Sequence, residues 1–209
     1  MVVLTKKVLS KSEINNYVKD IQNVEESHKK SQHSIVENAG HTSFMNSIRS
    51  HPKVKAEFAK LWGCKPEELI SSYDTYGYMR KGDAKTELWP HRDEPLSRRK
   101  RCYQGFVQLT DNINEGLVIW PNSDKNKIDP QEVDHKDGVL VKVKAGTLVI
   151  WDSKTVHCNI NNGERDRIVM YVCMVPKYML SKKAIKTLEL CEKMKITTNH
   201  TPFFPIPHP

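Results

Sequence analysis

The sequence predicts a mainly β protein with flanking helices. The chain has 209 residues, 38% of them hydrophobic and 28% charged, which is enough apolar material for one folded core. Between residues 70 and 175, short stretches with a period of two are separated by turn residues such as Lys81-Gly82-Asp83 and Asn161-Asn162-Gly163. No helical pattern lies between these stretches. Because parallel strands need crossover connections that are usually helical, we expect an antiparallel sandwich or barrel.

Helical patterns precede the expected strands. Ser10 with Glu13 three positions later has the form of a capping box and predicts a helix after Ser10. A shorter helix is expected over 44–49. Ser50 is the expected cap of a third helix, with Pro52 in its first turn and Gly63 at its end. Residues 23–42 are polar and without a pattern, which indicates a loop.

The strand patterns and the C-terminal part complete the expected organisation. Ser181 begins a last amphipathic helix, and the proline-rich end of the chain can be neither helix nor central strand. We expect a single domain over 1–209, with a helical part at 1–68, a core of strands at 69–176, and the C-terminal helix and tail at 177–209. The expected strands are 70–79, 86–92, 102–110, 116–120, 139–143, 147–151, 156–160 and 168–175.

Composition limits the class of protein. No apolar run approaches the roughly 20 residues of a membrane span, and Lys6-Lys7 interrupts the apolar start, so we expect neither a membrane protein nor a secretory signal. The five cysteines include no close pair, which argues against disulfides and a cysteine-based zinc site and favours the cytoplasm. The net charge of +8 is compatible with nucleic acid, an anionic surface or an anionic small substrate, and equally with a merely soluble surface.

Three residues have the pattern of a metal site. His91 and Asp93 are separated by one residue, so on a strand their side chains project to the same face. An iron(II) site of two histidines and one carboxylate needs a second histidine, and His157 is the candidate because it falls inside a strand pattern with apolar neighbours. The alternatives are a solvated ion pair at a strand end for the first two residues and an ordinary buried histidine for the third.

Arg167 is the candidate anion-binding residue. If Asn161-Asn162-Gly163 is a three-residue hairpin loop, His157 and Arg167 stand opposite each other on one face. A buried arginine needs an anionic partner, and a dicarboxylic acid can supply one. The alternative is a structural ion pair of Arg167 with Asp152 or Glu164.

This set of residues resembles the phytanoyl-CoA dioxygenase-like family of iron(II)- and 2-oxoglutarate-dependent oxygenases. The similarity covers about residues 44–202. It is carried by His91-Arg92-Asp93, His157 and Arg167, and by the stretches 48–63, 103–116, 146–157 and 197–200. One departure is Pro121-Asn122-Ser123-Asp124, where the family usually has Pro-Gly-Ser-His.

The resemblance implies a double-stranded β-helix (a cupin-like jelly roll) with its N-terminal and C-terminal helices packed on one sheet. It also implies that His91, Asp93 and His157 bind Fe(II) and that Arg167 binds the distal carboxylate of 2-oxoglutarate. Asn159 and Phe106 match positions that contact the co-substrate or line the pocket in some relatives. The implied activity is dioxygenase hydroxylation of a small organic substrate by O2, with release of succinate and CO2.

The basic run Arg98-Arg99-Lys100-Arg101 follows the metal motif. It has two interpretations, recognition of an anionic substrate or a solvated loop face. A nucleic-acid demethylase and a catalytically silent binding protein are the alternative functions. The first is disfavoured because Cys173 stands where such demethylases carry a further arginine, and the second because the whole set of site residues is present.

Overall fold

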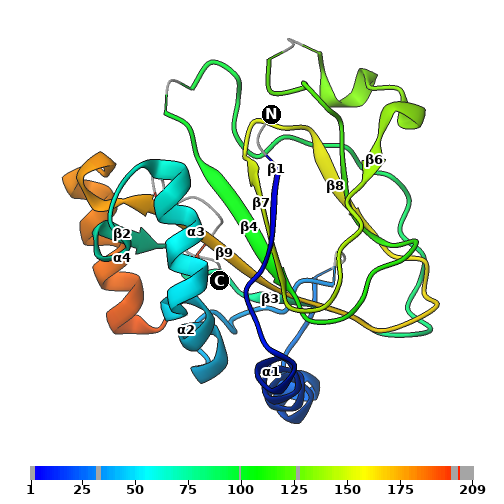
Figure 1. The fold of residues 1–209 in the computed structure, drawn as a ribbon, viewed down its shortest axis with the longest axis horizontal. Coiled ribbons are helices and arrows are strands. Elements are labelled where there is room, and N and C mark those ends of the chain that lie inside the picture. The colour runs from blue at the N-terminus through cyan, green and yellow to red at the C-terminus, as the bar shows by residue number, and fades with distance from the viewer. Residues whose placement is uncertain (1–2, 32–33, 99, 126–127, 199–201, 203–209) are drawn as a thin grey trace.

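Two antiparallel sheets form the centre of the protein, and helices pack against the larger sheet (Figure 1). The computed structural model describes residues 3–31, 34–98, 100–125, 128–198 and 202. The mostly β, antiparallel architecture expected from the sequence is therefore confirmed.

The larger sheet supplies one wall of the site. Its middle strands are buried along their whole length, because helices cover one face and the smaller sheet covers the other. The strand order is β1 (Val3–Lys7), β7 (Thr147–Asp152), β4 (Tyr103–Gln108), β9 (Arg167–Pro176) and β2 (Leu69–Ser71), and β3 (Tyr76–Met79) also pairs with β9.

The smaller sheet supplies the opposite wall. Its order is β6 (Val139–Leu140), β5 (Gly116–Ile119) and β8 (His157–Ile160). Side chains from both sheets meet in one apolar cluster, with Phe106 and Trp151 from the larger sheet against Leu117 and Ile119 from the smaller one. This cluster fills part of the space between the two sheets.

Helices pack on the larger sheet. The helices α1 (Lys11–Val24), α2 (Ser43–Ser50) and α3 (Pro52–Trp62) bury their apolar faces against its outer side. The helix α4 (Lys182–Met194) packs against Cys173 and Val175, which alternate along β9 with the residues facing α2 and α3. The N-terminal and C-terminal helices therefore pack on the same sheet, but they contact β9 residues whose side chains point in opposite directions.

Most of the predicted ends of the helices agree with the structure. Glu13 accepts a hydrogen bond from the backbone N–H of Ser10 at 2.7 Å, and the Ser10 hydroxyl accepts one from the backbone N–H of Glu13 at 3.3 Å, as a capping box requires. Gly63 has φ +64°, a left-handed conformation that ends α3. The N-cap of α3 is His51, not the expected Ser50.

Several expected strands are shorter than predicted. The stretch 70–79 is broken into β2 and β3 because Ser72 and Asp74 turn their side chains toward each other, with Ser72 Oγ donating to Asp74 Oδ2 at 2.7 Å. The stretch 86–92 keeps only one bridge, at His91, since Pro90 has no N–H to donate. Strand β1 was not predicted at all.

Much of the expected C-terminal tail is not described by the structure. Asn199 and His200 of the expected family tail, and the proline-rich segment 203–209, lie outside the described residues. Among the helices that the structure describes, none combines the length and the apolar character required to span a membrane.

Candidate metal centre

The backbones of two candidate ligands are hydrogen-bonded to each other. The N–H of His91 donates to the carbonyl of His157 at 3.0 Å, and the N–H of His157 donates back to the carbonyl of His91 at 3.0 Å. Residues paired in this way project their side chains to the same face. The two imidazole rings accordingly lie side by side, with centroids 4.4 Å apart.

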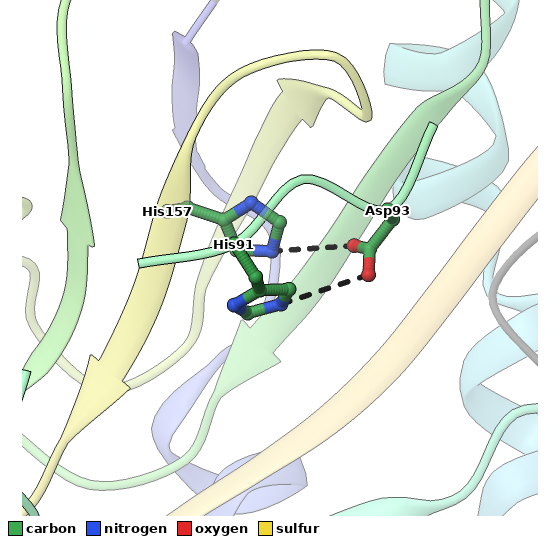
Figure 2. A group of neighbouring side chains, drawn as sticks. All are labelled: His91, Asp93 and His157. Carbon is green, nitrogen blue, oxygen red and sulfur yellow. Dashed lines mark ion pairs between the residues drawn. The ribbon is translucent and has the colours of Figure 1, made fainter. Parts of the chain in front are cut away.

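Asp93 completes the group (Figure 2). Its carboxylate lies beside both rings, with Oδ2 3.3 Å from Nε2 of His157 and Oδ1 3.6 Å from Nε2 of His91. The ligand atoms of the three residues all lie within 4.8 Å of one another, so the group can hold a metal ion. His157 is buried and Asp93 is exposed, so the group is open on the carboxylate side.

The second nitrogen of each ring is held by a carbonyl. Nδ1 of His157 lies 2.9 Å from the carbonyl of Thr155, and Nδ1 of His91 lies 3.3 Å from the carbonyl of Trp89. A ring nitrogen beside a carbonyl carries the proton, which leaves Nε2 with its lone pair. Both Nε2 atoms therefore face the shared centre in the form that a metal ion needs.

Two indole rings flank the histidines. Trp89 is stacked on His91 with ring centroids 4.2 Å apart and planes within 3°, and its Nε1 donates to the carbonyl of Asn159 at 2.9 Å. Trp151 lies on the other side, 5.2 Å from His157. The rings help to fix the positions of both imidazoles.

A small cavity of about 50 Å³ opens beside the three residues. Its walls include both tryptophans and the side chain of Ile35. Asn159 and Tyr171 line it as well, which connects the metal centre to the interior between the sheets.

Arg167 lies deep in that interior. It is 1% exposed, and its guanidinium lies over the ring of Phe106 at 5.4 Å and donates to Oδ1 of Asn159 at 3.0 Å. In the described part of the chain no carboxylate lies within ion-pair distance of it, and its Nε has no hydrogen-bond partner. The alternative of an ion pair with Asp152 or Glu164 is thus not what the structure shows, and Asp152 binds Arg101 instead.

The electrostatics favour an anion at this point. Burial lowers the pKa of the Arg167 guanidinium, and the neighbouring Tyr171 and Glu115 oppose that shift. Burial raises the pKa of Tyr171, so its hydroxyl stays protonated and can donate a hydrogen bond. Asn159 Nδ2 lies 3.5 Å from that hydroxyl. A carboxylate placed here would meet a cation and two neutral donors.

The expected hairpin between His157 and Arg167 is wrong. Gly163 has the left-handed conformation that a three-residue hairpin loop needs, with φ +71°. However, β8 pairs with β5 in the smaller sheet, while β9 belongs to the larger sheet. The loop therefore crosses from one sheet to the other. Arg167 reaches the region of His157 across the space between the sheets, and it meets Asn159 of β8 there.

The basic run is bound to other parts of the protein. Arg98 forms an ion pair with Glu94, which is 1% exposed, and Arg101 forms one with Asp152 at 2.8 Å. Arg99 lies outside the described residues. These contacts give the described arginines structural partners, and a contact with substrate stays a prediction.

Sequence reasoning missed some residues of the site. Tyr171 follows Arg167 by four positions on β9 and so shares its face, a signal that the period of two contains. Trp89 and Trp151 had no such signal, because an indole in a strand pattern is usually a core residue. The roles assigned to Asn159 and Phe106 remain predictions, although both contact Arg167.

The chain is similar in sequence to a curated protein and in structure to several solved enzymes. No protein-family profile matches the chain. The Ava biosynthesis cluster protein O of Aspergillus versicolor is 29% identical over 199 residues, which cover 78% of this chain and 64% of that protein. The chain thus spans less than two thirds of that curated relative.

Solved structures of non-heme, alpha-ketoglutarate-dependent enzymes share the fold. The epimerase SnoN from nogalamycin biosynthesis has a TM-score of 0.65 at 16% identity, over 83% of this chain and 76% of that one. A second structure of SnoN, with Fe3+, alpha-ketoglutarate and nogalamycin RO, has a TM-score of 0.63. The carbocyclase SnoK from the same biosynthesis has a TM-score of 0.63 at 19% identity, over 82% of this chain and 78% of that one. The chain therefore has the fold of these enzymes.

Proposed function

We propose that the protein is a non-haem iron(II)- and 2-oxoglutarate-dependent dioxygenase. The observation that carries the proposal is that two imidazoles and one carboxylate, from two separate segments of the chain, line one small cavity, and that the buried Arg167 is hydrogen-bonded to Asn159, which lines the same cavity. The fold shared with SnoN and SnoK supports it. We also propose that the sheets are those of a double-stranded β-helix and that the chain is phytanoyl-CoA dioxygenase-like.

The residues present fit the metal and the co-substrate. Two neutral imidazole nitrogens and one carboxylate suit iron(II) and leave coordination positions open. In the described part of the chain, the buried Nε of Arg167 has no hydrogen-bond partner and no carboxylate lies within ion-pair distance of the guanidinium. A dicarboxylic acid would satisfy it, held through parallel N–H···O bonds.

Each residue has a proposed task. His91, Asp93 and His157 hold the iron, and Arg167 binds the distal carboxylate of 2-oxoglutarate with the help of Asn159. The bound iron and co-substrate supply the activation of O2, with release of succinate and CO2. The indoles beside the histidines hold the imidazole rings in place.

The proposed substrate is a small organic molecule, and the proposed reaction is its hydroxylation. The SnoN structure holds nogalamycin RO, and the relative from Aspergillus versicolor is named for a biosynthesis cluster, which supports a small-molecule substrate. SnoN is an epimerase and SnoK a carbocyclase. Analysis of the product distinguishes hydroxylation from epimerisation and ring closure.

The test is an anaerobic titration of the protein with iron(II) and 2-oxoglutarate. We expect a visible metal-to-ligand absorption band and, after O2 is admitted, succinate. His91→Ala and Asp93→Ala should lose the band and the succinate while keeping the fold. His135→Ala is the matched control, because this histidine is exposed on a short 3₁₀ turn. Wild-type succinate from the Asp93 variant would show that the ligand assignment is wrong.

A further inference from the structure

Glu115 is a buried carboxylate that the proposed mechanism does not use. It lies directly before β5, its exposed fraction is 0%, and neither carboxylate oxygen accepts a well-aligned hydrogen bond, although the backbone N–H of Asn162 lies nearby. A buried carboxylate without a partner is costly, so its presence needs a reason.

Glu115 and Arg167 are close in the interior. On β5, Leu117 pairs with Asn159, and Asn159 accepts a hydrogen bond from Arg167. Glu115 precedes Leu117 by two positions, which places it next to this group. Each of the two charges shifts the pKa of the other in the direction expected for opposite charges, yet no ion-pair contact joins them. Both side chains are buried, at 0% and 1% exposed.

The other charges near Glu115 are exposed. Arg165 and Glu164 from the loop between β8 and β9 act on it with opposite sign, and both side chains are in solvent. Burial has the largest effect and raises the pKa of Glu115. Arg167 is thus the buried charge that stabilises the ionised form of Glu115.

We propose that Glu115 is the internal counter-charge of Arg167, and that it takes up one proton from solvent when the distal carboxylate of 2-oxoglutarate binds to that arginine. This inference rests on the proposed function. Before binding, one carboxylate and one guanidinium balance. After binding, two carboxylates share one guanidinium in a low-dielectric interior, and like charges there cannot both stay ionised. Glu115 becomes the neutral acid, because the proximal carboxylate of the ligand is bound to the metal and the distal one to Arg167.

The sign of the pH dependence follows from this exchange. Binding raises the pKa of Glu115, so the affinity for 2-oxoglutarate is greatest below the pKa of the ligand-free protein. It falls as the pH rises toward the pKa of the complex, by up to about tenfold per pH unit, since one pKa unit corresponds to about 1.36 kcal/mol.

Calorimetry measures the proton directly. The iron-loaded protein is titrated with 2-oxoglutarate under anaerobic conditions between pH 6 and 9, in two buffers of different ionisation enthalpy. For the wild type we expect uptake that approaches one proton in part of this range, together with falling affinity. For Glu115→Gln we expect no such proton uptake, and an affinity for 2-oxoglutarate that does not change with pH over this range. Glu164→Gln, which removes an exposed carboxylate from the same region, should behave as the wild type.

Each outcome decides between the alternatives. Protons exchanged by the metal ligands are common to all variants, so the difference between wild type and Glu115→Gln isolates this residue. Equal proton uptake in the two proteins would overturn this inference. Binding of 2-oxoglutarate would still support the proposed function. If Glu115→Gln does not fold, binding of 2-oxoglutarate to the wild type without proton uptake would likewise overturn the inference. A wild type that does not bind 2-oxoglutarate refutes the proposed function instead.

Discussion

Replacement of Arg167 by methionine tests the central electrostatic argument. Methionine keeps an unbranched side chain at a site that is 1% exposed and removes the guanidinium. Removal of the guanidinium also leaves the buried carboxylate of Glu115 without its counter-charge, so we expect the ligand-free variant to be less stable than the wild type. The effect of 2-oxoglutarate is therefore taken as the difference between each protein with and without the ligand.

The magnitude follows from ligand-linked stability. At 2-oxoglutarate concentrations about 100 times Kd, the wild type gains about 2.7 kcal/mol. For a chain of this size that is a rise in Tm of about 5–11 °C, at about 2–4 °C per kcal/mol. Two charged hydrogen bonds are worth about 1.5–3 kcal/mol each, so the variant should bind at least about 100-fold more weakly. At the same concentration its gain is about 0.4 kcal/mol, or about 1–2 °C.

The assay is thermal unfolding of the iron-loaded protein under anaerobic conditions, with and without 2-oxoglutarate. Arg165→Met is the matched control, since Arg165 is an exposed arginine two positions earlier, and it should keep the full shift. A shift above about 5 °C in Arg167→Met would refute the assignment of Arg167 as the anion-binding residue.

Three further predictions concern stability. Gly105→Ala should lower the free energy of unfolding by about 1–3 kcal/mol in urea titration, because an added Cβ would meet a carbonyl of the neighbouring strand at 2.5 Å; an unchanged value would contradict this close approach. Hydrogen bonds from Ser10 lower the pKa of Glu13 from 4.5 to about 2, so its contribution is present above pH 4.5 and is lost as the pH falls toward 2. Glu13→Gln should therefore be less stable than wild type by about 1 kcal/mol at pH 7, with a difference that disappears near pH 2 in unfolding experiments across that range. Arg98→Gln should cost about 2–3 kcal/mol in urea titration, because it strands the buried carboxylate of Glu94, and the added change Glu94→Gln should restore most of it; no rescue would mean that Arg98 acts elsewhere.

Local signals in the sequence predicted the helices and most strands well. Capping boxes, a first-turn proline and a terminal glycine act within a few residues, so they determine helix ends regardless of the rest of the fold. The period of two likewise identified the middle strands of the larger sheet. Strand β1 escaped because its lysines interrupt the apolar pattern, which an edge strand tolerates on its solvent side.

Non-local pairing was harder to predict. The loop Asn161-Asn162-Gly163 has the residues of a hairpin, and its glycine has the expected conformation, yet the flanking strands belong to different sheets. A turn motif determines the local backbone and does not say which strands pair. The structure does bring the three candidate metal ligands together, because the short spacing of His91 and Asp93 and the apolar neighbours of His157 are properties that the sequence carries. The position of Glu115 beside Arg167 depends on the packing of two sheets, and no local pattern contains it.

The reciprocal backbone pairing of His91 and His157 has a consequence for how the centre forms. Backbone pairing alone places two of the three candidate ligands in register, and the exposed Asp93 is the one that this pairing does not hold. The loss of conformational entropy on bringing the two imidazoles together therefore occurs when the chain folds. By the same logic, opening of the segment that carries His91 would release two donors at once, and the amide protons of both histidines should exchange with solvent as a single unit.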